Sequence, residues 1–181
     1  MNKIYIYLDR LKERLLRYYR REVFLKRINS KSTNINVLGK IHLNATNIKI
    51  GNNVNIYPGV YLWGDGEIII GDNVDIGIGT IIFSKKRVYI GNNTNIAGQC
   101  YIIDSNHSIN KNQLIREQKL DYNEEGLFIG DDVWIAAGCK IVKGAKINDG
   151  SVIGALSLVN SEIVSNGVAV GIPAKVVKNR E

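Results

Sequence analysis

Residues 129–159 read IGDDVWIAAGCKIVKGAKINDGSVIGALSLV, and every sixth residue in this stretch is aliphatic. The same period extends upstream to residue 50, and a small or β-branched residue follows most aliphatic positions four places later, as in Val133 and Ala145. The aliphatic register is Ile50, Ile56, Leu62, Ile70, Ile76, Ile82, Ile90, Ile96, Ile102, Ile129, Ile135, Ile141, Ile147, Ile153 and Val159. Every position in this register is Ile, Leu or Val, so the repeat is the feature that determines the fold.

The six-residue period predicts short strands that alternate with turns. In a strand, the small residue and the aliphatic residue two places later point to the same side, so both face inward. The first triplets begin at Ile50, Ile70 and Ile90, so three hexads make one coil of a solenoid. A helix would need a period near 3.6, and a β-sandwich would not hold this register. We predict an all-β, single-stranded parallel β-helix over residues 37–181, in which a glycine after the aliphatic residue, such as Gly71, lets the backbone bend at the corner.

The register breaks once, between Ile102 and Ile129, where 27 residues replace six. Insertions in a solenoid fall on one face and often build its binding site, so the loop 103–128 is where we expect the chemistry. The loop contains His107, one of two histidines in the chain; the other, His42, lies in the poorly repeating entry segment, where we expect a structural role. A histidine suits general-base catalysis near neutral pH. Taken by itself, however, a histidine in a loop is more often an exposed residue without a catalytic role.

The N-terminal segment holds nearly all of the excess positive charge. Residues 1–28 carry nine Lys and Arg against three Asp and Glu, or +6, which leaves +1 for the rest of the chain. The rest of the chain therefore lacks the positive surface expected of a protein that binds along the phosphates of a nucleic acid. We predict a basic amphipathic helical segment over residues 1–30, whose apolar stripe packs on the β-helix or contacts a membrane surface. The stripe is Ile4, Leu8, Leu11 and Leu15.

The apolar runs of the chain are short and interrupted. None approaches the roughly 20 apolar residues that span a bilayer, and Asp9 and Arg10 break the N-terminal run, which argues against a signal peptide. We expect a cytoplasmic protein, with residues 1–28 as a route to peripheral contact with the inner membrane surface. Cys100 and Cys139 form no CxxC pair and are predicted to be buried thiols.

The hexads, the loop sequence IDSNHS at 103–108 and the C-terminal sequence GIPAK at 171–175 resemble the hexapeptide-repeat acyltransferases. The resemblance is to the sugar and polysaccharide O-acetyltransferases, including those acting on maltose and galactosides. It implies a left-handed β-helix, acetyl-CoA as co-substrate, no required metal, and a homotrimer with active sites between subunits. It also implies transfer of an acetyl group to a sugar hydroxyl, in polysaccharide biosynthesis, with His107 as the general base.

Three residues are candidates to contact the acceptor. Asp104 could orient the His107 imidazole, hydrogen-bond the acceptor or form an Asx turn. Asp121 matches, counting back from the next hexad, a carboxylate that contacts the acceptor in sugar acetyltransferases of this family. Trp134 lies between two inward positions and should point outward. Its ring could contact the acceptor or CoA, form a subunit interface, or have no specific role.

The resemblance also supplies candidates for cofactor binding. In the family, CoA lies along stacked coil corners, where Ala137 and Ala155 would let the pantetheine approach the backbone. Lys175 and Lys178 match basic residues that meet the CoA phosphates, with a solvated tail as the alternative. Relatives have a Thr-Lys pair where this chain has Asn160-Ser161, so one phosphate contact is missing.

Other features bear on the acceptor and the assembly. Relatives have an acceptor-binding Asn where this chain has Gly77-Ile78-Gly79-Thr80, which indicates a different acceptor. Outward residues recur at the coil spacing and form an apolar stripe suited to a trimer interface: Tyr61, Ile81 and Tyr101.

The same coil serves other classes of protein. These are N-acetyltransferases of nucleotide-linked amino sugars, serine and antibiotic acetyltransferases, and zinc carbonic anhydrases, which need three histidines around each metal. A non-catalytic spacer is the remaining alternative, although a spacer has no need of the long histidine loop.

Overall fold

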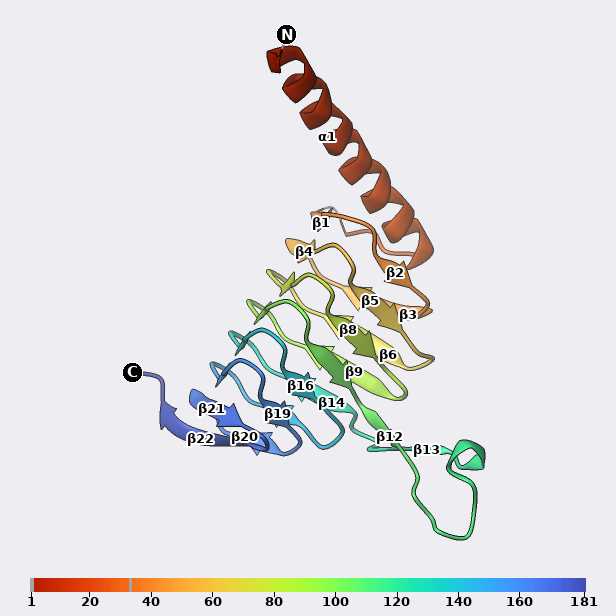
Figure 1. Cartoon of the computed structure of the whole chain (residues 1–181), viewed down its shortest axis with the longest axis vertical. Coiled ribbons are helices and arrows are strands. Elements are labelled where there is room, and N and C mark those ends of the chain that lie inside the picture. The colour runs from red at the N-terminus through yellow and green to blue at the C-terminus, as the bar shows by residue number, and fades with distance from the viewer. Residues whose placement is uncertain (1, 33) are drawn as a thin grey trace.

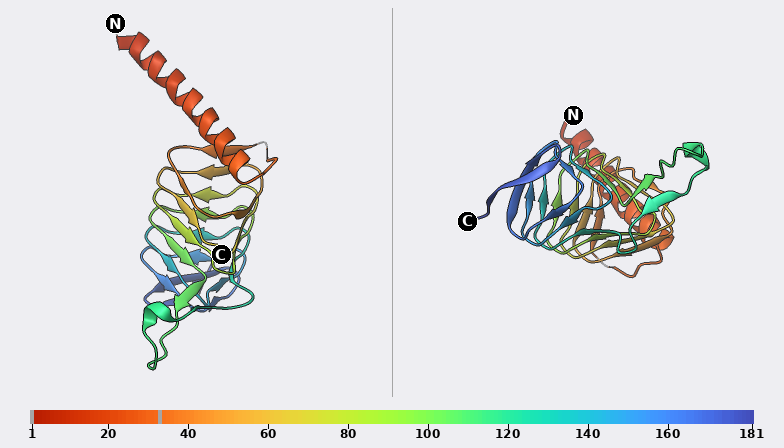
Figure 2. Two further views of the ribbon diagram at one scale, coloured as in Figure 1. Left: turned by 90° about the vertical axis from the view of Figure 1, so that its right-hand side faces the viewer. Right: turned by 90° about the horizontal axis from the view of Figure 1, so that it is seen from below.

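The chain folds as a stack of coils, described for residues 2–32 and 34–181 by a computed structural model (Figure 1). Three parallel sheets run along the stack and form the sides of a prism that is seen from one end in Figure 2. Strands about one coil apart in sequence are neighbours in each sheet, as in the pairing of Ile56 with Ile76 and of Ile76 with Ile96. The predicted fold, a left-handed parallel β-helix with an N-terminal helix and one long inserted loop, is confirmed.

The first sheet contains, in spatial order, β1 (Ile35–Val37), β4 (Val54–Ile56), β7 (Asp75–Ile76), β10 (Asn95–Ile96), β15 (Trp134–Ile135), β18 (Val152–Ile153), β21 (Gly167–Gly171) and β22 (Ala174–Asn179). The second sheet contains β2 (His42–Leu43), β5 (Tyr61–Trp63), β8 (Ile81–Phe83), β11 (Tyr101–Ile103), β16 (Lys140–Ile141) and β19 (Leu158–Val159). The third sheet contains β3 (Asn47–Ile50), β6 (Glu67–Ile70), β9 (Arg87–Ile90), β14 (Leu127–Ile129), β17 (Lys146–Ile147) and β20 (Glu162–Ile163). Within these three sheets, the described strand pairs are parallel except β21 with β22, which is antiparallel.

The core is the column of inward aliphatic side chains. Ile76, Ile102 and Ile135 are each fully buried, and each stacks on its equivalent in the next coil through the strand register. Burying one such side chain contributes about 1.5–3 kcal/mol, and a single coil cannot bury its own face. The buried thiols predicted for Cys100 and Cys139 are confirmed, since both lie in this column.

The corners between the third and first sheets depend on an asparagine, and the glycine has a different role from the one predicted. Asn73 and Asn93 adopt left-handed backbone with φ of 58° and 57°, a conformation that asparagine tolerates better than most residues. Gly71 does not make the bend. A Cβ at Gly71 would lie 2.6 Å from Oδ1 of Asn92 and 2.9 Å from the carbonyl carbon of Gly91. Glycine is required there because the next coil approaches the backbone directly.

Polar side chains join successive coils at the same corner. Oδ1 of Asp72 accepts the backbone N–H of Asn52 at 2.6 Å, and Oδ1 of Asn92 accepts that of Asp72 at 2.9 Å. Asp131 and Asp149 continue the pattern, accepting the N–H groups of Asn92 and Asp131 at 2.7 Å and 2.8 Å. The bonds satisfy donors that the turn leaves out of the sheets.

Glu67 connects three coils on the outside of the third sheet. Its Oε1 lies 2.6 Å from Nζ of Lys49 and its Oε2 lies 3.0 Å from Nε of Arg87. The hydrogen bond from Lys49, supported by Arg87, holds the pKa of Glu67 below its ordinary value of 4.5. A carboxylate with a depressed folded-state pKa contributes stability above its unfolded-state pKa, and that stability is lost as the pH falls through the folded-state pKa.

Glu67→Gln should therefore lower the melting temperature at pH 7, and the difference from wild type should shrink as the pH falls below 4.5. Thermal denaturation followed by circular dichroism from pH 7 to pH 3 measures this difference. Glu125→Gln, at an exposed position of the long loop, serves as the control. If the difference in melting temperature between Glu67→Gln and wild type did not depend on pH, the charge of Glu67 would not be the source of the stabilisation.

Helix α1 (Asn2–Arg27) covers the first coil with its C-terminal end only. Phe24, Leu25 and Ile28 are buried against the β-helix, whereas the rest of the helix extends away from the coils (Figures 1 and 2). The prediction that the stripe from Ile4 to Leu15 packs on the β-helix is wrong, because these side chains are exposed. In the described residues, no helix is both long enough and apolar enough to cross a membrane.

The long loop is partly ordered as an antiparallel arm. Strands β12 (Ser105–His107) and β13 (Leu120–Tyr122) pair with each other, and the 3-10 helix η1 (Ile115–Glu117) lies at the far end. The arm extends outward from the corner between the second and third sheets (Figure 1). It thereby presents His107 on a two-stranded support outside the prism.

Candidate active site

Asp104 fixes the root of the arm to the preceding coil. Its side chain is buried, and its two carboxylate oxygens accept the backbone N–H groups of Lys85, Lys86 and Arg87 at 2.7, 2.7 and 2.8 Å. The hydroxyl of Ser84 lies at hydrogen-bonding distance, 3.3 Å. The predicted contact of Asp104 with an acceptor or with His107 does not fit this placement, because its carboxylate is enclosed by the turn at 84–87. Asp104 is a positioning residue.

His107 lies at the outer end of β12 with its side chain exposed. Its backbone register pairs it with Leu120, and the next residue, Ser108, donates its hydroxyl to the carbonyl of Lys119 at 2.8 Å. Within the described residues, no hydrogen bond holds the imidazole itself. Both ring nitrogens are thus free for a hydroxyl or an amine of a bound molecule.

A cavity of about 650 Å³ lies along the arm. Its lining is mixed in charge and consists of Lys85, Ser108, Lys119, Leu120, Asp121, Tyr122 and Glu124. The predicted acceptor residue Asp121 thus lines the cavity, and β13 places it across from Asn106, the neighbour of His107. An ion pair joins Asp121 to Lys143 of the following coil.

Two further lysines at the edge of the cavity are paired with carboxylates. Lys86 donates to Glu124 at 2.6 Å and Lys85 donates to Asp65, and each hydrogen bond raises the pKa of its lysine. Lys143, Lys85 and Tyr122 were not predicted from the sequence. Asp121 lies within the inserted loop and Lys143 in the coil that follows it, so the six-residue period does not relate the two positions.

Trp134 points outward from β15, as its pleat position predicts, and is 52% exposed. It lies on the first sheet between Asn95 and Val152 of the adjacent coils. A cavity of about 340 Å³ beside it is also lined by Asp132 and Arg180, whose side chains form an ion pair at 2.8 Å. The ring therefore forms one wall of an open hollow on a different side of the prism from the arm.

Ala137 and Ala155 occupy equivalent corners of two stacked coils, between the first and second sheets. Both are exposed, and the N–H of Leu156 donates to the carbonyl of Ala137 at 3.0 Å, which holds the two corners together. Each alanine presents only a methyl group at its corner. A long, thin ligand could lie against this edge.

Lys175 and Lys178 lie on β22, the last strand of the first sheet. They pair with Val170 and Val168 of β21, and both side chains are exposed. Their positions at the C-terminal end of the stack leave both ammonium groups accessible to an anionic ligand.

The outer face of the second sheet is apolar over several coils. Tyr61, Ile81 and Tyr101 are register neighbours, so the predicted stripe exists. A second row beside it contains Trp63 and Phe83, whose rings meet edge to face with centroids 4.9 Å apart. At the upper end of the stripe, the His42 ring stacks on Tyr61 at 3.9 Å, which agrees with a structural role for His42.

One chain places His107 and Asp121 at neighbouring register positions of the same arm, away from the other candidates. His107 lies at the corner between the second and third sheets, Ala137 at the corner between the first and second, and Trp134 on the first sheet. Metal-binding clusters of three or more His, Cys, Asp or Glu side chains are absent from residues 2–32 and 34–181.

The sequence and fold match known hexapeptide proteins. The model of the "Bacterial transferase hexapeptide (six repeats)" family matches residues 126–161. The dTDP-4-amino-4,6-dideoxy-D-glucose acyltransferase of Escherichia coli is 33% identical over 172 residues, which cover 90% of this chain and 88% of that protein. Two other curated relatives match over a smaller part, so that the chain spans only 28% and 25% of their length.

Solved structures share the architecture. The N-acyltransferase AntD from Bacillus cereus superposes with a TM-score of 0.78 at 22% identity, covering 90% of this chain and 89% of that one. A maltose O-acetyltransferase from Clostridium difficile 630 gives a TM-score of 0.57 at 29% identity, covering 91% and 76%. With the end-to-end match to the E. coli protein, these findings establish that the chain belongs to the hexapeptide-repeat acyltransferase family.

Proposed function

We propose that this protein transfers an acetyl group from acetyl-CoA to a hydroxyl of a sugar, in a surface polysaccharide or its precursor. The observation that carries the proposal is the placement of His107, exposed and free of internal hydrogen bonds, on an arm that borders a cavity. A polar cavity along the arm that carries this free imidazole suits an acceptor with several hydroxyl groups. Residues 103–128 act as the catalytic loop of the domain formed by residues 37–181.

His107 acts as the general base in a single direct transfer. The imidazole takes the proton of the acceptor hydroxyl as its oxygen attacks the thioester carbonyl carbon. A C–O bond forms, the C–S bond breaks, and the proton on His107 passes to the departing sulfur. Backbone N–H groups stabilise the oxyanion between these events. Asp121 orients the acceptor from across the arm, with Lys143 fixing its carboxylate.

The stacked corners at Ala137 and Ala155 would hold the pantetheine arm of the acyl donor, and Lys175 and Lys178 its phosphates. The support is that both alanines are exposed and both lysines lie on an accessible edge strand. Lysine is suited to phosphate contact as a mobile point charge. Trp134 would pack against the acceptor or the donor with its exposed ring.

A homotrimer would complete the site. In one chain, His107 and the donor corner lie on different corners of the prism, so a donor bound at Ala137 meets the His107 of a neighbouring chain in this proposal. The apolar outer face of the second sheet, containing Tyr61, Ile81 and Tyr101, is the surface that three copies would bury.

Trp63→Glu combined with Phe83→Glu should dissociate the trimer into monomers, because each change places a charge in an apolar interface. Multi-angle light scattering measures the mass, and thiol release measures activity, which we expect to fall with the trimer. Val164→Glu, at an exposed residue outside this face, is the matched control. A wild-type monomer at micromolar concentration would contradict the shared site.

Thiol release from acetyl-CoA, measured with a panel of acceptors, tests the proposed activity. The panel contains neutral mono- and oligosaccharides, serine and nucleotide-linked amino sugars. We expect release that depends on a sugar with free hydroxyls, with the acetyl ester identified by mass spectrometry. Absence of acetyl-CoA binding would overturn the proposal.

Acylation of the amine of a nucleotide-linked amino sugar is the second candidate. It is favoured by the match over 90% of this chain to an E. coli acyltransferase whose name specifies such a substrate. An amide product that forms only with an amino sugar would establish this candidate in place of O-acetylation.

A further inference from the structure

Helix α1 presents an apolar face that its own β-helix leaves uncovered. At 100° per residue, the apolar side chains of residues 4–19 other than Ile6 gather on roughly half of the helix circumference, interrupted there by Lys12 alone. The face consists of Ile4, Tyr5, Tyr7, Leu8, Leu11, Leu15, Leu16, Tyr18 and Tyr19. Exposed fractions of 52% for Leu8, 61% for Leu15 and 60% for Tyr18 show that the face is open to solvent.

A row of arginines borders this face. Arg10, Arg14, Arg17 and Arg21 follow one another at helical spacing and line, with Tyr18, a cavity of about 720 Å³ between the helix and β1. One of the four, Arg21, is paired with the carboxylate of Glu22 at 2.6 Å. None of the described residues that line the cavity is acidic, so the row is a surface for anionic groups.

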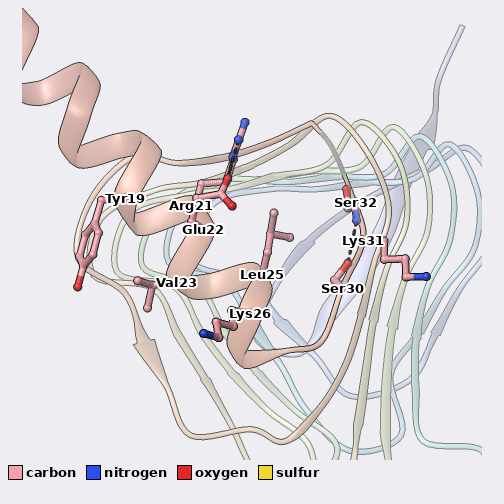
Figure 3. A pocket seen from close by; sticks show the side chains of 9 residues that line it. All are labelled: Tyr19, Arg21, Glu22, Val23, Leu25, Lys26, Ser30, Lys31 and Ser32. Atoms are coloured by element: carbon pink, nitrogen blue, oxygen red, sulfur yellow. Dashed lines mark hydrogen bonds and ion pairs between the residues drawn. The ribbon is translucent and has the colours of Figure 1, made fainter.

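The mixed apolar and basic character continues to the end of the helix. Tyr19, Val23 and Lys26 line a second open cavity, of about 620 Å³, which Lys31 borders from the following segment (Figure 3). The residues buried against the first coil, Phe24, Leu25 and Ile28, lie at this end of the helix and just after it. The helix is therefore anchored at one end and free along the rest of its length of about 40 Å.

We propose that α1 binds the surface of an anionic lipid bilayer and lies in its plane. An apolar face, tyrosines on both sides of it and a flanking arginine row are the features of helices that bind at the boundary between headgroups and acyl chains. Charge complementarity supports this occupant, because residues 1–28 carry a net +6. A second copy would offer no matching acidity, since the rest of the chain carries a net +1.

Sedimentation of the full-length protein with vesicles tests the proposal. We expect binding to vesicles that contain phosphatidylglycerol and much weaker binding to vesicles of phosphatidylcholine alone. Leu8→Glu with Leu11→Glu should weaken binding by about a hundredfold, because two leucines no longer enter the bilayer. Arg10→Glu with Arg14→Glu should weaken binding by about thirtyfold or more.

Lys111→Glu with Arg116→Glu is the charge-matched control, since it makes the same change in net charge on the exposed long loop. This variant should bind anionic vesicles as the wild type does. Light scattering accompanies each sample, because a change of oligomeric mass in the Leu8 and Leu11 variant would assign the face to a second copy. That result would overturn the proposal. So would a wild-type protein that does not bind anionic vesicles, or a variant with both leucines replaced that binds them as the wild type does.

Discussion

His107→Ala should lower the rate of acetyl transfer by about 10²- to 10⁴-fold, the usual contribution of a positioned general base. The expected loss is in kcat, because the acceptor oxygen keeps its proton as it attacks. The affinity for acetyl-CoA should change little, because we assign the binding of its pantetheine arm to Ala137 and Ala155 and of its phosphates to Lys175 and Lys178, which the substitution leaves intact. Steady-state thiol release gives the rate, and isothermal titration calorimetry gives the affinity.

Ile109→Ala is the matched control for the arm, because Ile109 lies two residues further along and is 83% exposed. It should leave the rate within about twofold of wild type, as expected of a surface substitution without a packing role. If His107→Ala kept the full rate while Asp121→Ala lost it, Asp121 rather than His107 would be the general base.

Asp104→Ala should be among the most destabilising substitutions in the chain. Its carboxylate accepts three backbone N–H groups, and removing it leaves those donors without partners at a buried position. Breaking a buried, fully bonded charge typically costs about 3–5 kcal/mol. We expect a lower melting temperature and faster amide hydrogen exchange at residues 85–87 and in the arm.

Asp121→Ala provides the comparison for Asp104→Ala. The Asp121 carboxylate is about half exposed and bonds to one surface lysine, so its loss should cost less than about 1 kcal/mol. Urea denaturation of both variants separates the two roles. Equal stability of Asp104→Ala and wild type would mean that other bonds hold the turn at 84–87.

The β-helix could be predicted because every coil repeats the same pattern of aliphatic and small residues. Fifteen aliphatic positions and their small partners specify the inward side, and the pleat then fixes the outward direction of Trp134 and Tyr61. The glycines misled the prediction about the corners. A glycine directly after the aliphatic residue suggests a bend at the glycine, whereas the structure places the bend at Asn73 and the close approach of the next coil at Gly71.

The candidate site could be predicted only where the chemistry is local. The loop and its histidine are visible as a break in the register, but Asp104 bonds to a turn in the preceding coil, which no local pattern reveals. The amphipathic pattern of α1 likewise identifies an apolar face without naming what covers it. Of the two placements predicted for the stripe, packing on the β-helix was wrong for that reason, since the residues buried against the coils are Phe24, Leu25 and Ile28.

The two ends of the stack are covered, and this covering keeps one molecule from pairing end to end with another. A β-helix of identical coils has an unpaired strand at each end, and the first coil of one molecule could pair with the last coil of another. Such head-to-tail contact does not close on itself and would propagate into fibrils. The last turns of α1 block growth at β1, and the antiparallel strand β22 occupies the edge of β21. The substitution Phe24→Asp, which would lift the helix from the first coil, should therefore cause the protein to polymerise.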